Sequence, residues 1–214
     1  MAIATGTNLL ALFNNNTTDA TGNHTINNNN SCTFETGWKA EGTHSVQMDA
    51  ATMNCKTSSA VASAIKTLEF YVYITSQSSG YYLYGIDGSN MQVQWYGGKI
   101  WWTITGTAWQ NSVSVGATTQ THLAWTFDET DIKFFKDGVE EESVINSEVP
   151  TNRVHRIGNS YSDNSALHCN YDVWRLSTIV QGTIPTVDPP DAEHKIKLTK
   201  GAFSRGRFSK GDFK

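Results

Sequence analysis

Several residue types that mark common protein classes are scarce in this sequence. The 214 residues include only three cysteines and four prolines, and charged residues make up 17% of the chain. No stretch approaches the ~20 apolar residues that a membrane-spanning helix needs, so we expect no membrane span. The residues before Phe13 contain neither lysine nor arginine, and the apolar run there is short. We therefore expect no secretory signal peptide.

The cysteines are too few and too scattered to predict a disulfide framework or a zinc site. Cys32, Cys55 and Cys169 are an odd number and lack the spacing of metal ligands. Cys32 and Cys55 could pair across a modest loop; the alternative is three reduced, buried thiols. Chains made without export usually keep their thiols reduced, which favours the alternative.

Asparagine, threonine, serine and glycine are abundant instead, as is typical of an all-β protein with many polar turns. The length suits one large β-sandwich followed by a tail. Charge is unevenly distributed: residues 191–214 hold seven lysines and arginines against three acidic residues, whereas the whole chain has a net charge of −4. A basic tail on an acidic body can bind nucleic acid or a membrane, or it can dock on an acidic neighbour. We expect docking, and no nucleic-acid partner.

The segment 120–139 has the pattern of two antiparallel strands. Leu123, Trp125 and Phe127 alternate with other residues, as in a strand with one buried face, and Asp137-Gly138 marks a tight turn after the second strand at 132–136. Residues 14–30 are predicted as an asparagine-rich loop, and 50–64 as a loop or one helical turn. Further strands are predicted at residues 8–13, 31–35, 45–49, 67–75, 139–144, 154–157 and 168–177, with a hairpin within 81–105.

The run H-L-A-W-T-F-D at 122–128, followed by F-K-D-G-V at 135–139, resembles the signature of laminin-G-like domains in the concanavalin-A-like lectin/glucanase superfamily. Other blocks follow in the family's order: D-A-T-G-N-H at 19–24, S-V-Q-M-D at 45–49, L-E-F-Y-V-Y-I at 68–74, R-I-G-N at 156–159 and Y-D-V-W-R-L at 171–176. The resemblance implies an antiparallel jelly-roll sandwich at residues 1–182. Residues 183–214 remain as a proline-containing linker and an extended C-terminal tail.

The glucanase branch of this superfamily uses paired carboxylates in an E-x-D-x-x-E motif. The nearest match is Glu129-Thr130-Asp131, but Phe134 takes the place of the second glutamate and the residues fall in a turn. The run 140–142 of three glutamates is interpreted as a solvated strand edge that discourages pairing. Because no other catalytic motif is present, the sequence predicts a protein that is not an enzyme.

The hairpin within 91–105 has one apolar face and one face of aromatic and amide side chains. Aromatic rings stack on sugar faces, while amides and carboxylates bond the hydroxyl groups. The candidate carbohydrate-binding residues are Gln92, Gln94, Tyr96, Trp101, Trp109 and Asp87. The alternative is that these aromatic residues only fill the sandwich.

No cofactor is predicted, although Ca²⁺ is possible, because the resemblance implies that a rim calcium site can occur. Calcium needs about six to eight oxygen ligands. Candidate carboxylates are Asp87, Asp128, Asp163 and Asp172. The sequence favours turn formation for each of them, and no metal ligand is assigned.

The tail ends in a repeat of period five, G-A-F-S-R, G-R-F-S-K and G-D-F-K. We interpret it as a docking segment in which phenylalanines fill pockets on a partner and arginines contact its acidic rim. Its residues are Phe203, Arg205, Arg207, Phe208 and Phe213. The alternative is a disordered tail.

Short basic repeats behind a laminin-G-like domain resemble bacteriophage virion proteins. The sequence therefore suggests a structural or adhesion protein of a virion, such as a capsid decoration or a tail fibre component, which is part of an oligomeric assembly. In that hypothesis the tail binds other proteins of the particle and the sandwich contacts cell-surface glycans. The alternative is a free carbohydrate-binding lectin, which would reach the extracellular space without a signal peptide.

Overall fold

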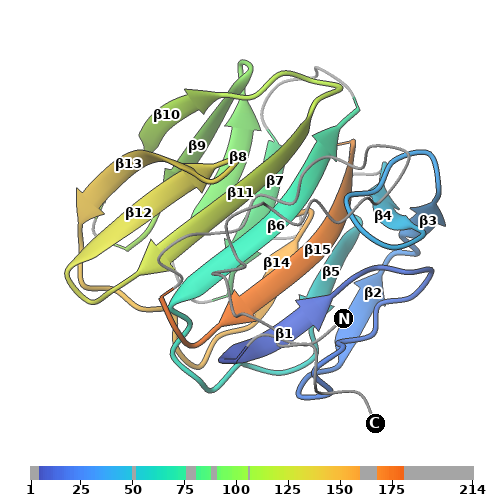
Figure 1. The fold of residues 1–214 in the computed structure, drawn as a ribbon, viewed down its shortest axis with the longest axis horizontal. Helices are drawn as coiled ribbons and strands as arrows, with labels where there is room; N and C mark the ends of the chain where they lie inside the picture. The colour runs from blue at the N-terminus through green and yellow to red at the C-terminus, as the bar shows by residue number, and fades with distance from the viewer. Residues whose placement is uncertain are drawn as a thin grey trace, which may run out of the picture.

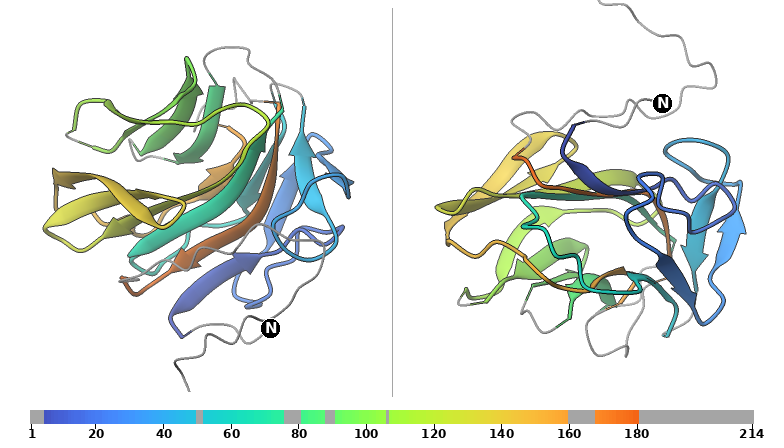
Figure 2. Two further views of the ribbon diagram at one scale, coloured as in Figure 1. Left: turned by 45° about the horizontal axis from the view of Figure 1, so that its top comes forward. Right: turned by 90° about the horizontal axis from the view of Figure 1, so that it is seen from below.

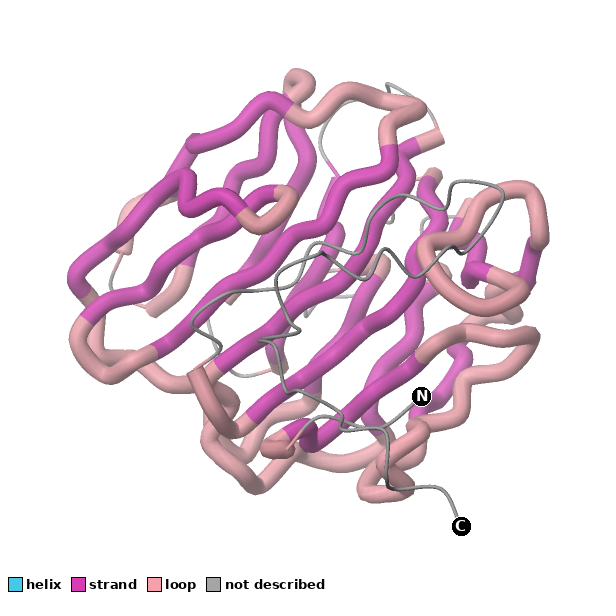
Figure 3. The backbone as a smooth tube through the Cα atoms, viewed as in Figure 1, coloured by secondary structure: helices cyan, strands magenta, loops and turns pink. Residues whose placement is uncertain are grey.

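The computed structural model describes residues 5–49, 52–75, 81–87, 91–105, 107–159 and 168–180. Within these ranges the chain forms fifteen strands and no helix (Figures 1 and 3). No helix in this part of the chain is therefore long and apolar enough to cross a bilayer. The strands are β1 (Thr7–Ala11), β2 (Ile26–Asn29), β3 (Thr33–Glu35), β4 (Ser45–Met48), β5 (Asn54–Thr57), β6 (Thr67–Ile74), β7 (Tyr81–Ile86), β8 (Gln92–Tyr96), β9 (Lys99–Thr103), β10 (Gln110–Ser114), β11 (Gln120–Phe127), β12 (Asp131–Lys136), β13 (Val139–Ile145), β14 (His155–Ile157) and β15 (Cys169–Ser177).

The strands form two antiparallel sheets that pack face to face (Figure 2). The eight-stranded sheet has the order β13-β12-β11-β6-β15-β4-β3, with β1 paired to β15, and the seven-stranded sheet has the order β10-β9-β8-β7-β14-β5-β2. Neighbours in the sheets are often distant in the chain, because the chain crosses repeatedly between the layers. The predicted all-β antiparallel sandwich is confirmed. The tail and the predicted boundary at 182 lie outside the described residues.

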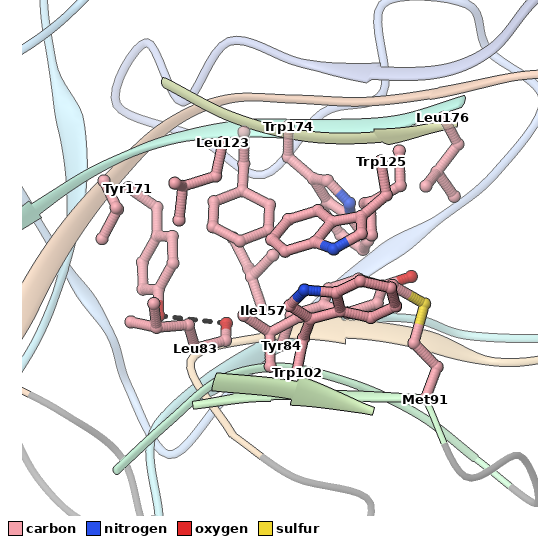
Figure 4. Close-up of a cluster of buried hydrophobic side chains, with 14 of the residues drawn as sticks. Leu83, Tyr84, Met91, Trp102, Leu123, Trp125, Ile157, Tyr171, Trp174 and Leu176 are labelled. Carbon is pink, nitrogen blue, oxygen red and sulfur yellow. Dashed lines mark hydrogen bonds between the residues drawn. The ribbon is translucent and has the colours of Figure 1, made fainter. Parts of the chain in front are cut away.

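Large aromatic side chains fill the space between the two sheets (Figure 4). Trp125 of β11 stacks on Phe134 of β12 with ring centroids 4.7 Å apart, and Trp102 of β9 approaches the same Phe134 from the other sheet at 6.5 Å. The hydroxyl of Tyr171 donates a hydrogen bond to the carbonyl of Leu83 at 3.1 Å, again between the sheets. Buried aromatic rings therefore join the layers and fix their spacing.

Two tight turns have the backbone that their sequences predict. Gly97-Gly98 between β8 and β9 and Asp137-Gly138 between β12 and β13 all have positive φ values, from 49° to 80°. Positive φ at both central residues matches the twist of the flanking strands, and glycine adopts it without steric cost. These turns set the register of both hairpins.

Three strands were missed by the sequence analysis: β2, β5 and β10. The first lies in the asparagine-rich stretch and the second in the segment expected to be a loop or a helical turn. In β2 only Ile26 is buried, so the strand carries almost no alternating apolar signal. Pairing with a neighbouring strand, and not local pattern, defines these elements.

All three cysteines are buried and stand outside any disulfide. A hydrogen bond with the thiol of Cys55 lowers the pKa of Cys32, and the same contact raises the pKa of Cys55. The structure thus has three thiols, as the favoured interpretation expected, with two of them in contact.

Candidate functional site

The β8–β9 hairpin has one face in the core and one face that points away from it. Val93 and Trp95 of β8 and Ile100 and Trp102 of β9 are buried. The residues that alternate with them are half-buried or exposed and form the outward face, which we call the hairpin face: Gln92, Gln94, Tyr96, Lys99, Trp101 and Thr103. The strict alternation in the sequence thus predicts which side chains share this surface.

Register brings the amides of the hairpin face beside its aromatic residue. Gln94 is directly opposite Trp101, and Gln92 is directly opposite Thr103. On the other side of β8, Gln94 is opposite the half-buried Tyr82 of β7. Tyr82 belongs to the same surface, although the sequence analysis did not name it as a carbohydrate contact. A register shift follows Tyr82 in β7.

Two aromatic rings meet edge to face at the end of this surface. Tyr96 is 51% exposed, and its ring centroid lies 6.5 Å from that of Trp101 at an interplanar angle of 75°. The indole N–H of Trp101 donates to the carbonyl of Tyr96 at 3.3 Å. The indole is therefore held in place by its own hairpin while it remains partly open to solvent.

The other two predicted carbohydrate contacts lie at the margins of the hairpin face. Trp109 is 41% exposed and immediately precedes β10, whose Gln110 pairs with Trp102 of β9. Asp87 follows β7, beyond the end of β8 that is far from Tyr96, and its carboxylate forms an ion pair with Arg156 of β14. The structure therefore brings four of the six predicted residues together and places Trp109 and Asp87 on either side.

The candidate calcium ligands do not converge in the described part of the chain, where no group of three or more histidine, cysteine, aspartate or glutamate side chains is placed to hold a metal. Asp128 accepts the backbone N–H groups of Asp131 and Thr130, and these bonds hold its pKa well below the usual range. Asp172 accepts the N–H groups of Ala40 and Glu41. These carboxylates therefore do not fit a shared calcium site, and Asp163 lies outside the described residues.

The acidic residues considered for catalysis are engaged elsewhere. Glu129 lies in the turn before β12 and forms an ion pair with Lys66 at 2.8 Å. Phe134, at the place of the second glutamate, is fully buried in the core. The paired carboxylates of the glucanase motif, which the sequence analysis found incomplete, are therefore not assembled at this turn.

No protein-family model and no curated protein matches this chain. Among solved structures, domain 4 of a GH43 extracellular arabinanase from Geobacillus stearothermophilus, in complex with arabinotriose, has a TM-score of 0.64 and 17% identity, and the match covers 84% of this chain and 94% of that one. A sialidase from Trypanosoma rangeli has a TM-score of 0.65 and 12% identity, over 86% of this chain but 32% of the sialidase. The receptor-binding domain of botulinum neurotoxin type G has a TM-score of 0.59 and 13% identity, over 81% of this chain and 48% of that one.

These neighbours correct one expectation from the sequence. The missing catalytic motif led us to expect a protein that is not an enzyme, but glycoside hydrolases are among the proteins that share this fold. A fold hosts different activities through residues that can be distant in sequence, so one absent local motif does not exclude catalysis. At these identities the likeness establishes the β-sandwich fold alone, and a phage origin stays a prediction.

Proposed function

We propose that this sandwich binds a glycan on the hairpin face. The observation that carries the proposal is the register of Gln94 beside Trp101, with Tyr96 edge-on to the same indole. Such a surface offers an aromatic ring to the C–H face of a sugar and amide groups to its hydroxyls. Binding sites of this kind combine apolar contact with a few placed polar groups.

The rigidity of the hairpin face supports recognition. Trp95 and Trp102, which alternate with the outward residues, are buried in the core, so the strands beneath the surface cannot shift easily. The indole of Trp101 is also held by its hydrogen bond to Tyr96. A side chain that is already ordered loses less conformational entropy when a ligand binds.

The structural neighbours favour the same ligand class. The arabinanase domain was solved with arabinotriose, and the sialidase was solved with a fluorinated sialic acid. Both ligands are carbohydrates, although they differ in charge. The hairpin face carries amides and one ionised side chain, Lys99, which lies directly opposite Tyr96. At its margin Asp87 is paired with Arg156. The hydroxyl groups of a neutral glycan fit the amides and rings of this surface, and Lys99 offers a contact for an acidic group.

A glycan array that includes arabinotriose and sialylated glycans tests the proposal with the full chain. We expect binding to at least one glycan on the array. This binding should fall by about tenfold or more in Trp101→Ala and be largely kept in Trp101→Phe. Ile145→Ala is the matched control, because Ile145 is a 93% exposed apolar side chain on the other sheet. Glycan binding at this face would be refuted if the wild-type protein gave no signal on the array, or if a folded Trp101→Ala variant bound unchanged.

A finer proposal rests on the sequence of the tail alone. In it, the protein belongs to an assembled particle such as a phage virion, and residues 183–214 dock on another protein of that particle. Truncation after Pro190 should then abolish incorporation into particles without changing the thermal unfolding of the sandwich. Normal incorporation of the truncated chain would contradict this role.

A further inference from the structure

A concave surface lies at the other end of the sandwich from the hairpin face. It is a cavity of about 500 Å³ that is lined by residues of the segment 16–28 and by Phe34 of β3. The strands β2 and β3 that border it are edge strands, and in the seven-stranded sheet β7, β14 and β5 separate β2 from β8. Figure 1 shows these blue strands far from the green strands β8 to β10.

A buried carboxylate gives this end cavity its shape. Asp19 is 4% exposed and accepts the backbone N–H groups of Leu10, Thr21 and His24 at 2.9 to 3.0 Å. It also accepts the hydroxyl of Thr21 at 2.7 Å. Four donors on one carboxylate fix the loop against β1, so the cavity wall is formed before any ligand arrives.

The polar side chains of the wall are oriented by their own hydrogen bonds. Asn28 accepts the N–H of Cys32 at 2.8 Å and donates to its carbonyl at 3.0 Å. The hydroxyl of Thr17 donates to the carbonyl of Ile26 at 3.1 Å, and His24 is joined through Nε2 to Asn8 at 2.5 Å. An amide nitrogen has two donor hydrogens and a hydroxyl oxygen has two lone pairs, so these groups retain capacity for a ligand.

The chemistry of the wall selects a class of ligand. It contains amides, hydroxyls and an imidazole, together with the half-buried ring of Phe34 and the buried side chain of Ile26. Among the residues that the structure describes, no lysine or arginine lines the cavity and Asp19 is its one carboxylate, which is already saturated with donors. A phosphate or carboxylate would therefore find no counter-charge, and a metal cation would find no free carboxylate.

We propose that the end cavity binds one neutral sugar residue, with a C–H face of the ring against Phe34 and hydroxyls on the asparagine and threonine side chains. The volume lies within the usual range of about 300–1,000 Å³ for small-molecule sites. This second site is independent of the hairpin face, because the two share no residue. A chain with both sites can hold two positions of one large glycan, which raises avidity without any new contact.

Saturation-transfer-difference NMR on the full chain tests this site with free arabinose, glucose, galactose and galacturonic acid as probes. Thr25 is exposed and lines the cavity, so Thr25→Tyr should fill it without disturbing the core. Thr36→Tyr is the matched control, since Thr36 is exposed nearby but does not line the cavity. Phe34→Leu keeps an apolar side chain and removes the ring.

We expect saturation transfer to at least one neutral sugar and little transfer to galacturonic acid. Thr25→Tyr and Phe34→Leu should weaken binding by about tenfold, whereas Thr36→Tyr and Trp101→Ala should leave it unchanged. The proposal is overturned if no neutral sugar is saturated, if galacturonic acid binds as well as galactose, or if the folded Thr25→Tyr variant binds normally. Loss of sugar binding in Trp101→Ala alone would support the hairpin face and reject the end cavity.

Discussion

The indole N–H of Trp102 on β9 donates a hydrogen bond to the carboxylate of Glu142 on β13, at 3.0 Å. The bond links a strand of the seven-stranded sheet to the edge strand of the other sheet. Trp102 is fully buried, and a buried indole N–H without an acceptor costs free energy. One glutamate of the acidic run at 140–142 is therefore an interior partner and not only a charged edge.

Removal of that acceptor should destabilise the sandwich. We expect Glu142→Ala to lower the free energy of unfolding by about 1–3 kcal/mol, since it leaves the Trp102 N–H unsatisfied, whereas Glu142→Gln keeps an acceptor and costs less. Chemical denaturation measures both. The adjacent Glu141 is exposed, so Glu141→Ala should change stability by less than about 0.5 kcal/mol. Equal effects of the two alanine variants would show that the hydrogen bond contributes nothing.

A buried ionic cluster provides the second prediction. Glu69 of β6 forms an ion pair with Arg175 of β15 and a hydrogen bond with His122 of β11 at 3.2 Å. The side chains of Glu69 and His122 are 6% and 3% exposed. The ring of Tyr71 stacks on His122 with centroids 4.5 Å apart. Glu69→Gln should therefore lower the free energy of unfolding by roughly 3 kcal/mol, because the partly buried guanidinium of Arg175 loses its counter-charge.

The exposed ion pair of Lys66 and Glu129 is the natural comparison for this cluster. The side chain of Glu129 is 64% exposed. Exposed pairs contribute about 0–1 kcal/mol, so Glu129→Gln should have little effect on urea unfolding. If Glu69→Gln were as mild as Glu129→Gln, the buried cluster would be energetically neutral.

The strongest periodic patterns of the sequence predicted the fold, but features with a weak local pattern or with long-range contacts could not be predicted. In β6 and β11, alternating large apolar residues define strand and register because a slip by one residue would expose a whole face. The hairpin face was predictable for the same reason, with Gly97-Gly98 marking its turn. The end cavity was not predictable, because its walls combine an asparagine-rich loop with Phe34, and neither segment has a periodic apolar pattern. The contact of Trp102 with Glu142 spans 40 residues and has no local signal.

His155 predicts a loss of stability in acid. Complete burial lowers the pKa of this histidine to about 3 from an ordinary value of 6.5, and its Nδ1 shares a hydrogen bond with the hydroxyl of Tyr84. Between pH 3 and 6.5 the unfolded chain therefore binds a proton that the folded chain does not. The contribution to stability is complete above pH 6.5 and falls as the pH drops, by at most ~1.4 kcal/mol per pH unit.

The variant His155→Gln isolates this titration. The difference in unfolding free energy between wild type and His155→Gln should become smaller or change sign as the pH is lowered from 7 to 4, measured by urea denaturation at each pH. A constant difference for His155→Gln would mean that the buried imidazole does not resist protonation.

Asp172 should have the opposite pH dependence. Burial raises the pKa of its carboxyl from 3.8 to about 7, even though it accepts the N–H groups of Glu41, Ala40 and Val173, which favour the charged form. Between pH 3.8 and 7 the folded chain holds a proton that the unfolded chain releases, so the contribution of Asp172 to stability decreases as the pH rises through this window. In Asp172→Asn the stability advantage of the wild type should shrink from pH 4 to pH 7, by at most ~1.4 kcal/mol per pH unit. Urea denaturation over that range measures this advantage, and Asp128→Asn at an exposed position is the comparison. An advantage of the wild type that grows with pH would show that the three N–H donors outweigh burial and keep Asp172 ionised.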